Sequence, residues 1–408
     1  MIKLASTEEP MASNEQQLSN QSNFYTGRYL MSLTHEDMDF SGVKNVLKNE
    51  LGLKVAQMGD FDDKESVTEK EYEDSDMMIF EDIGVALLGI DEDQSEVASA
   101  LSVRGNFILE PEEVIMAPDP QALSVQNKST WGITATDVDK SSYSGKGVKI
   151  AILDTGFDFK HPDFSGRTIQ SKSFVPNESA DDINGHGTHC TGTACGHKDS
   201  SGVRYGVAYD SDIFIGKVLG GKKGQGTDSW ILSGINWAVS NNCQIISMSL
   251  GSRVFPGQGH KLAYERAAKY ALKQGSLIIA ASGNDSHRPF NINPIGSPAN
   301  VPSIMSVAAV DSNLKVARFS NRAINPGTMM EISGPGVGVY SSWITSTKPY
   351  NTISGTSMAT PHVAGIAGLY AEKFPIHTPI QLWGALTSQA KPLSVPVGDY
   401  GAGLVLAP

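Results

Sequence analysis

The feature that most restricts the fold is a series of short apolar runs that begins near residue 145. The runs lie at residues 148–153, 213–218, 245–250, 277–281 and 304–310. Stretches with helical spacing of apolar residues separate some of them, at residues 229–242 and 261–275. Apolar strands that alternate with helices are typical of a parallel sheet covered on both faces. We therefore predict an α/β domain with a parallel sheet and helices on both faces.

Charge divides the chain into two unequal parts. The length of 408 residues exceeds what one hydrophobic core usually reaches. Residues 1–118 hold 8 Lys and Arg against 25 Asp and Glu, whereas the remaining residues hold 24 against 19. Opposite net charges suit two bodies that attract each other. An acidic chain without a basic aromatic face also argues against nucleic acid as a partner.

The first part has its own pattern of strands and helices. Residues 1–23 are polar and aperiodic, which predicts a disordered tail. Beyond the tail, the apolar pattern predicts strands at residues 28–33, 53–58, 76–90 and 106–116, with helices at 40–52 and 91–103. The order strand, helix, strand, strand, helix, strand is that of a ferredoxin-like α+β domain. We place this domain at residues 24–117.

Two absences limit the cellular setting. No apolar run reaches the roughly 18 residues that a membrane helix needs, and the first 20 residues contain no signal-peptide core. We expect no membrane partner, and a cytoplasmic protein as the sequence stands or a secreted one if a leader has been removed. The three cysteines, Cys190, Cys195 and Cys243, cannot all pair, so reduced thiols are expected.

Three segments contain residues suited to nucleophilic catalysis. Asp154 lies in ILDTG, His186 in NGHGTHCTGTACG and Ser357 in SGTSMATPHVAG. A serine hydroxyl is a weak nucleophile until a base removes its proton, and histidine titrates near neutrality. A carboxylate behind the imidazole fixes its tautomer. In a catalytic group made of these residues, Ser357 would be the nucleophile, His186 the base and Asp154 the orienting carboxylate.

These blocks, in the order Asp, His, Ser, resemble the catalytic blocks of the subtilisin-like serine peptidases, or subtilases. The resemblance covers residues 131–408. It implies a serine endopeptidase that hydrolyses proteins and peptides through an acyl-enzyme at Ser357, without an organic cofactor. It further implies that the Ser357 N–H and the Asn284 amide bind the oxyanion.

The same resemblance implies a substrate cleft with two edges. A substrate strand would pair between one edge, Gly224 and Gly226, and the other, Ser249, Leu250 and Gly251. Gly296 is expected at the base of the pocket for the residue before the scissile bond, where it leaves room for large apolar side chains.

Asp228 falls near a more distant subsite of this cleft. A charge there would favour a basic substrate residue. A solvated surface position is the simpler interpretation, and we adopt it.

Several residues near the predicted base have simpler interpretations. Cys190 follows His186 by one helical turn, so we expect a small buried side chain beneath the imidazole, where a mercurial would inhibit the enzyme. The spacing of His186, His189 and Cys190 matches no common zinc pattern, so no zinc is predicted. His189, His161 and His362 are predicted to be structural.

Many subtilases bind calcium, and the resemblance points to three carboxylates that would help to hold it. These are Asp163, Asp199 and Asp311. Calcium prefers several oxygen ligands. The loop at residues 196–206 differs in length and content from the usual calcium loop of the family. We therefore predict structural calcium, with that loop as its doubtful element.

The resemblance extends more weakly to residues 24–117, as an inhibitory prodomain. Such a prodomain packs its sheet on the enzyme, lays its last strand along the cleft and assists folding of the parallel sheet. The chain would then be a monomeric zymogen that cuts itself between Val114 and Ser129, in a linker at residues 118–130. The alternative is a catalytically silent subtilisin-like regulator that uses its cleft to bind proteins.

Overall fold

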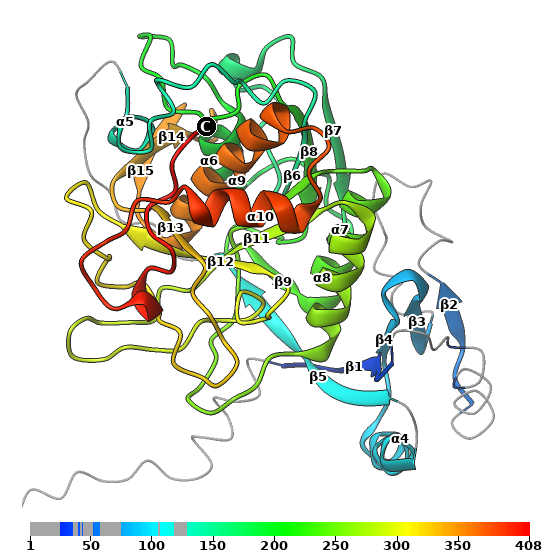
Figure 1. The fold of residues 1–408 in the computed structure, drawn as a ribbon. Helices are drawn as coiled ribbons and strands as arrows, with labels where there is room; N and C mark the ends of the chain where they lie inside the picture. The colour runs from blue at the N-terminus through cyan, green and yellow to red at the C-terminus, as the bar shows by residue number, and fades with distance from the viewer. Residues whose placement is uncertain are drawn as a thin grey trace, which may run out of the picture.

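The computed structural model describes residues 25–35, 40, 43, 52–57, 75–104, 107–117 and 129–408. The predicted tail, most of the predicted helix at 40–52 and residues 118–128 of the predicted linker lie outside the described residues. Figure 1 shows a large body and a smaller body that packs beside the green helices. We call them the C-terminal part (residues 129–408) and the N-terminal part (residues 25–117).

A seven-stranded parallel sheet forms the centre of the C-terminal part. Its strand order is β13-β12-β11-β10-β6-β8-β7. The strands are β6 (Lys149–Asp154), β7 (Ile169–Ser173), β8 (Asp212–Lys217), β10 (Ile245–Met248), β11 (Leu277–Ala281), β12 (Met305–Val310) and β13 (Ile332–Pro335). The α/β class and the five predicted strands are confirmed, and β7 and β13 are additional edge strands.

Helices cover both faces because the strands are apolar on both. In β6, Ala151 and Leu153 pack in the cluster that contains α7 (Asp228–Ser240) and α8 (Leu262–Gln274). Ile150 and Ile152 pack in the opposite cluster. That cluster contains α6 (His186–Cys195), α9 (Thr356–Lys373) and α10 (Pro379–Ser388). The sequence did not predict α10.

Smaller elements complete this part. They are α5 (Trp131–Ala135), the 3₁₀ turns η3 (Pro162–Phe164) and η4 (Val397–Asp399), and the hairpin of β14 (Val339–Ser342) and β15 (Tyr350–Ile353). The three cysteines are buried and form no disulfide. Among the described residues, no helix has both the length and the apolar character that a membrane span requires.

The N-terminal part contains β1 (Tyr25–Leu33), β2 (Val55–Gln57), β3 (Met77–Phe80), η2 (Glu81–Ile83), β4 (Val85–Leu88), α4 (Glu92–Arg104) and β5 (Phe107–Met116). The prediction of one strand over residues 76–90 is wrong, because β3 and β4 form a hairpin there. Gly84 makes the turn possible with a φ of +64°, a conformation that other residues rarely adopt. β2 is a short edge strand, parallel to β3.

The two parts share a sheet and a core. The sheet order β2-β3-β4-β1-β5-β9 ends on β9 (Gln225–Thr227), which belongs to the C-terminal part. Side chains of the N-terminal sheet, including Leu30, Phe80 and Val85, join the hydrophobic cluster of α7 and α8. The N-terminal part is therefore packed firmly on these two helices (Figure 1).

Candidate active site

The end of β6 and the start of α6 bring Asp154 and His186 together. His186 Nδ1 lies 2.8 Å from Asp154 Oδ1, and the two side chains are 3% and 1% exposed. Gly185 precedes the helix with a φ of +107°, and a Cβ there would meet the Trp343 ring. Only glycine therefore lets the chain turn into α6 at this point. The arrangement fixes the imidazole against the carboxylate.

A second carboxylate, Asp182, holds this corner, and the sequence analysis missed it. Asp182 accepts hydrogen bonds from Thr155 Oγ1 and from both the backbone N–H and the hydroxyl of Thr188. It also accepts from the backbone of Asn184 and Gly185. It thus ties the end of β6 to the first turn of α6. Its position two residues before the NGHGTH segment was the available signal, since carboxylates often cap helices.

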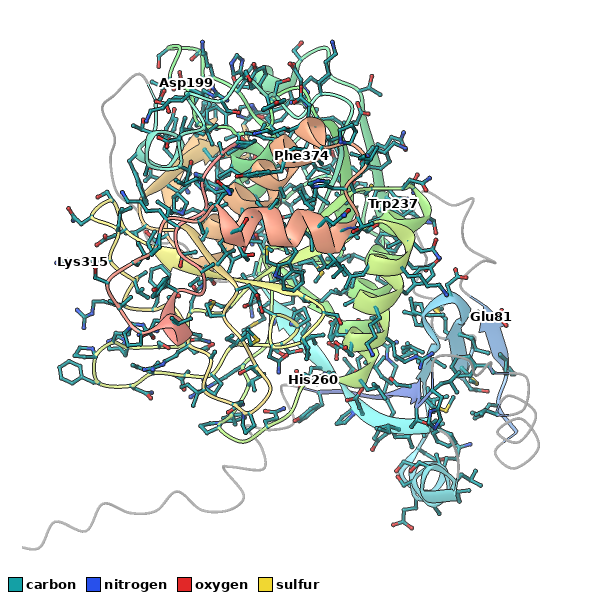
Figure 2. The ribbon with its side chains drawn as sticks, viewed as in Figure 1. Glu81, Asp199, Trp237, His260, Lys315 and Phe374 are labelled. Atoms are coloured by element: carbon teal, nitrogen blue, oxygen red, sulfur yellow. The ribbon has the colours of Figure 1, made fainter. Side chains whose placement is uncertain are left out.

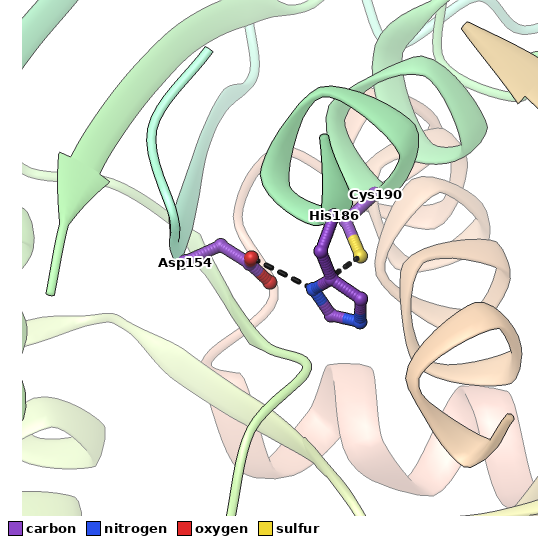
Figure 3. Close-up of side chains that lie close together, drawn as sticks. All are labelled: Asp154, His186 and Cys190. Atoms are coloured by element: carbon purple, nitrogen blue, oxygen red, sulfur yellow. Dashed lines mark hydrogen bonds and ion pairs between the residues drawn. The ribbon is translucent and has the colours of Figure 1, made fainter. Parts of the chain in front are cut away.

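Ser357 is the second residue of α9, and Cys190 lies between its backbone and His186. The Cys190 Sγ lies 3.8 Å from His186 Nδ1 and 3.5 Å from the carbonyl oxygen of Ser357. Figure 3 shows the thiol beside the imidazole, as the sequence predicted. Ser357 Oγ donates to the carbonyl of Ser249 at 3.2 Å. The Ser249 hydroxyl donates back to the Ser357 carbonyl at 2.8 Å.

The environment of His186 sets its protonation. Burial lowers the pKa of His186, but the charge and hydrogen bond of Asp154 together with those of Cys190 outweigh burial and hold this pKa well above its ordinary value. Its Nε2 is buried and forms no hydrogen bond with any residue that the structure describes. Burial lowers the pKa of His189 to about 3 and that of His362 to about 4. These two histidines are therefore neutral near pH 7, as a structural role requires.

Asp154, His186 and Cys190 are the one group of potential metal ligands that lie within 4.8 Å of one another in the described part of the chain. They do not suit zinc. The His186 nitrogen on this side is bonded to Asp154, and burial raises the pKa of the Cys190 thiol. A neutral thiol is a poor zinc ligand.

Asn284 follows β11 and contacts the start of α9. Its Oδ1 accepts from the Thr356 N–H at 2.9 Å and from the Thr356 hydroxyl at 3.0 Å. A Cβ built on Gly355 would lie 3.3 Å from Asn284 Nδ2 and 3.6 Å from the Ser357 nitrogen. The two nitrogens therefore flank one small space beside Gly355. The first N–H groups of a helix have no partner within the helix, so this space suits developing negative charge.

The two predicted cleft edges lie on either side of β5. On one side β5 runs antiparallel to β9, with Ile115 opposite Gly226 and the Ala117 N–H bonded to Gly224 O at 2.8 Å. On the other side the Met116 N–H donates to Gly251 O at 3.4 Å. Gly224 has a φ of +60°, and a Cβ there would lie 2.9 Å from the Ala117 Cβ. The glycine thus allows β5 to approach closely.

Gly296 lies near this edge, because a Cβ on it would approach Ser252 O at 2.7 Å, and Leu250 beside the same edge is buried. The interpretation of Asp228 as a solvated residue is wrong. Asp228 is 0% exposed and accepts hydrogen bonds from Lys261 Nζ, the Tyr264 hydroxyl and the Glu113 N–H.

Two of the predicted calcium ligands accept hydrogen bonds from the protein with both of their oxygens. The oxygens of Asp163 accept from the hydroxyls of Tyr205 at 2.7 Å and Tyr350 at 2.9 Å. Asp199 uses one oxygen for a turn at residues 201–203 and the other for the Tyr340 hydroxyl. Calcium takes several oxygen ligands, and calcium at Asp163 and Asp199 stays a prediction. Asp311 accepts from the backbone of residues 313 and 315 with one oxygen, and calcium there stays a prediction.

Comparison with known proteins agrees with this geometry. Residues 145–403 match the model of the subtilase family. The chain is 40% identical over 277 residues to subtilisin DY of Bacillus licheniformis. The aligned region covers 67% of this chain and 94% of that protein. It is 38% identical over 303 residues to M-protease of Shouchella clausii (strain KSM-K16). This aligned region covers 73% of this chain and 74% of that protein. The chain belongs to the subtilase family and is a serine endopeptidase of the subtilisin type.

Proposed function

We propose that this endopeptidase is made as a zymogen that cuts itself, with residues 24–117 as its inhibitory prodomain. The observation that carries the proposal is the position of β5, which pairs with β9 on one side and contacts Gly251 on the other. An extended segment in that position has the form in which peptidases bind their substrates. β5 ends at Met116, within the interval from Val114 to Ser129 where we expect the cut.

In the proposed mechanism, Ser357 Oγ attacks the carbonyl carbon of the scissile bond while His186 Nε2 takes the hydroxyl proton. Nε2 returns that proton to the leaving amine as the peptide bond breaks. Water then attacks the acyl-enzyme by the same route. Asp154 holds the Nδ1 proton, which leaves the Nε2 lone pair available. The Ser357 N–H and Asn284 Nδ2 would bind the oxyanion. Because Ser357 Oγ is bonded to Ser249 O at rest, attack requires a rotation of this side chain.

The contacts of the N-terminal part with α7 and α8 support its assignment as the inhibitor. Glu110 and Glu112 accept hydrogen bonds from the first turns of α8 and α7. Arg266 of α8 donates to the carbonyls of Leu33 and Ile83. These bonds seat the N-terminal sheet on the enzyme and hold β5 in the cleft.

The test is the intact mass of purified protein over time, for the wild type and for Ser357→Ala. We expect the wild type to split between residues 114 and 129 and the mutant to stay whole. A mutant that is processed like the wild type would refute self-cleavage.

The alternative, a silent protein-binding regulator, has one observation in its favour. Ser357 Oγ bonds to Ser249 rather than to His186 Nε2. Labelling of the incubated protein with a serine-directed fluorophosphonate distinguishes the two. Labelling of the wild type but not of Ser357→Ala supports the endopeptidase, whereas an unlabelled and unsplit wild type supports the regulator.

A further inference from the structure

Three glutamates of β5 contact one face of the C-terminal part. Glu110, Glu112 and Glu113 lie within seven residues of Met116, the residue that contacts Gly251. Glu112 is 0% exposed and Glu113 is 8% exposed. Burial of charged groups is costly unless partners compensate it, so the groups that receive these carboxylates form a built site.

Two of the glutamates bind helix N-termini. Glu110 accepts from the N–H groups of Leu262 and Ala263 at 2.9 and 3.2 Å, at the start of α8. Glu112 accepts from the Ser229 N–H at 3.0 Å, at the start of α7. Both helices have 13 residues, and their N-termini favour negative charge.

The third glutamate binds side chains. Glu113 accepts from the Ser252 hydroxyl at 2.5 Å, and Lys261 Nζ lies 3.4 Å from its carboxylate. The Glu113 N–H donates to Asp228 Oδ2 at 2.8 Å. Asp228 in turn holds Lys261, so the cation is fixed where it meets the glutamate.

Glu112 also accepts from Thr26 and Arg28 of the N-terminal part itself. The receiving residues of the C-terminal part are Asp228, Ser229, Ser252, Lys261, Leu262 and Ala263, and we call them the acidic-segment site. In the proposed function the prodomain is cut and leaves, whereas these residues stay beside the cleft. Asp228, Lys261 and Tyr264 keep their mutual bonds, because none of these depends on β5.

We infer that the processed enzyme uses the acidic-segment site to bind acidic extended segments of its protein substrates. The preferred segment carries glutamates at the positions of Glu110, Glu112 and Glu113, upstream of the residue that contacts Gly251. Net positive charge on the receiving part favours this class, since residues 119–408 hold 24 Lys and Arg against 19 Asp and Glu. This inference rests on the proposed function and adds a substrate class to it.

The test compares two fluorogenic peptides after the full chain has processed to constant activity on casein. One contains Glu-Pro-Glu-Glu-Val-Ile-Met-Ala and the other Gln-Pro-Gln-Gln-Val-Ile-Met-Ala, each followed by the same residues. We expect kcat/KM to be about tenfold higher for the acidic peptide, because ionised acceptors bind N–H donors more strongly than amides do.

Two variants and a control locate the effect. Lys261→Met should reduce the ratio of the two kcat/KM values to about two, and Ser252→Ala should reduce it in part without changing a charge. Lys273→Met, in the last turn of α8, should leave the ratio unchanged. Equal kcat/KM for the two peptides in the wild type, with casein still cleaved, would overturn this inference alone. Absence of cleavage of both peptides and casein would overturn the proposed function with it.

Discussion

The catalytic group and the acidic-segment site are built differently. Asp154, His186 and Ser357 sit at a strand end and at two helix starts, where short hydrogen bonds near the backbone fix them. The acidic-segment site instead binds long glutamates from a distant part of the chain. The first group should determine how fast a bound peptide reacts, and the second should determine what occupies the cleft. Substitutions in the catalytic group should therefore change the reaction rate, and substitutions at the acidic-segment site should change which peptides bind.

The largest effect should come from the catalytic side. Asn284→Ala removes one of the two nitrogens beside Gly355, and we expect kcat to fall on the order of 100- to 1000-fold, the loss known for a comparable amide in subtilisin. KM should change little, because the oxyanion forms only in the transition state. Steady-state kinetics on a peptide substrate measures both. A fall of less than fivefold would remove Asn284 from the catalytic group.

Acid pH should also act on the catalytic side. A protonated His186 cannot accept the serine proton, and its pKa is held well above the ordinary value by Asp154. Because the shift is upward, kcat/KM should fall about tenfold per pH unit below a pKa that itself lies above about 6.5. A pH profile of kcat/KM measures this. Asp154→Asn should move the acid limb to lower pH, and a wild-type limb at or below pH 6.5 would contradict the assignment.

A substitution in the interface between the N-terminal part and the enzyme should change when activity appears and leave kcat unchanged. Glu112→Gln weakens bonds to Ser229, Thr26 and Arg28, so the cut prodomain should dissociate about tenfold faster. The kcat of the fully activated enzyme should equal that of the wild type. The lag before casein cleavage measures the dissociation of the prodomain, and the final rate of cleavage measures kcat. Glu96→Gln, on the exposed side of α4, is the matched control. A lower final kcat for Glu112→Gln would contradict the separation of the prodomain interface from the catalytic group.

The smallest effect should arise outside both regions, around Asp163. Figure 2 shows the neighbouring residue Asp199 far from Glu81 of the N-terminal part. Tyr205→Phe removes the hydroxyl that donates a hydrogen bond to Asp163. This loss should lower the free energy of unfolding by about 1–3 kcal/mol. Denaturant unfolding should show the same loss with calcium and with a chelator, because the donor is tyrosine. A loss that calcium restores would show that Asp163 binds the metal.

The contact between Asp154 and His186 could be predicted from the sequence, because each residue lies in a short motif at the end of a predicted element. Asp154 directly follows an apolar run, and Ser357 lies in the first turn of α9. The burial of Asp228 could not be predicted, because its partners Lys261 and Tyr264 are 33 and 36 residues away and Glu113 is 115 residues away. Only the folded chain brings them together.

The errors in the fold have local causes. Residues 76–90 are apolar on both sides of a turn that has a single glycine, so the hairpin resembled one strand. The edge strands β7, IQSKS, and β13, ISGP, lack the apolar run that identified the central strands.

The position of β5 makes activation depend on dilution under the proposed scheme. While the chain is uncut, β5 is tethered to the cleft that it fills, and a short tether gives an effective concentration in the millimolar range. After the cut, the prodomain competes only at its actual concentration in solution. A crowded store of processed protein would therefore stay silent, and release into a larger volume would switch it on without any further chemical step.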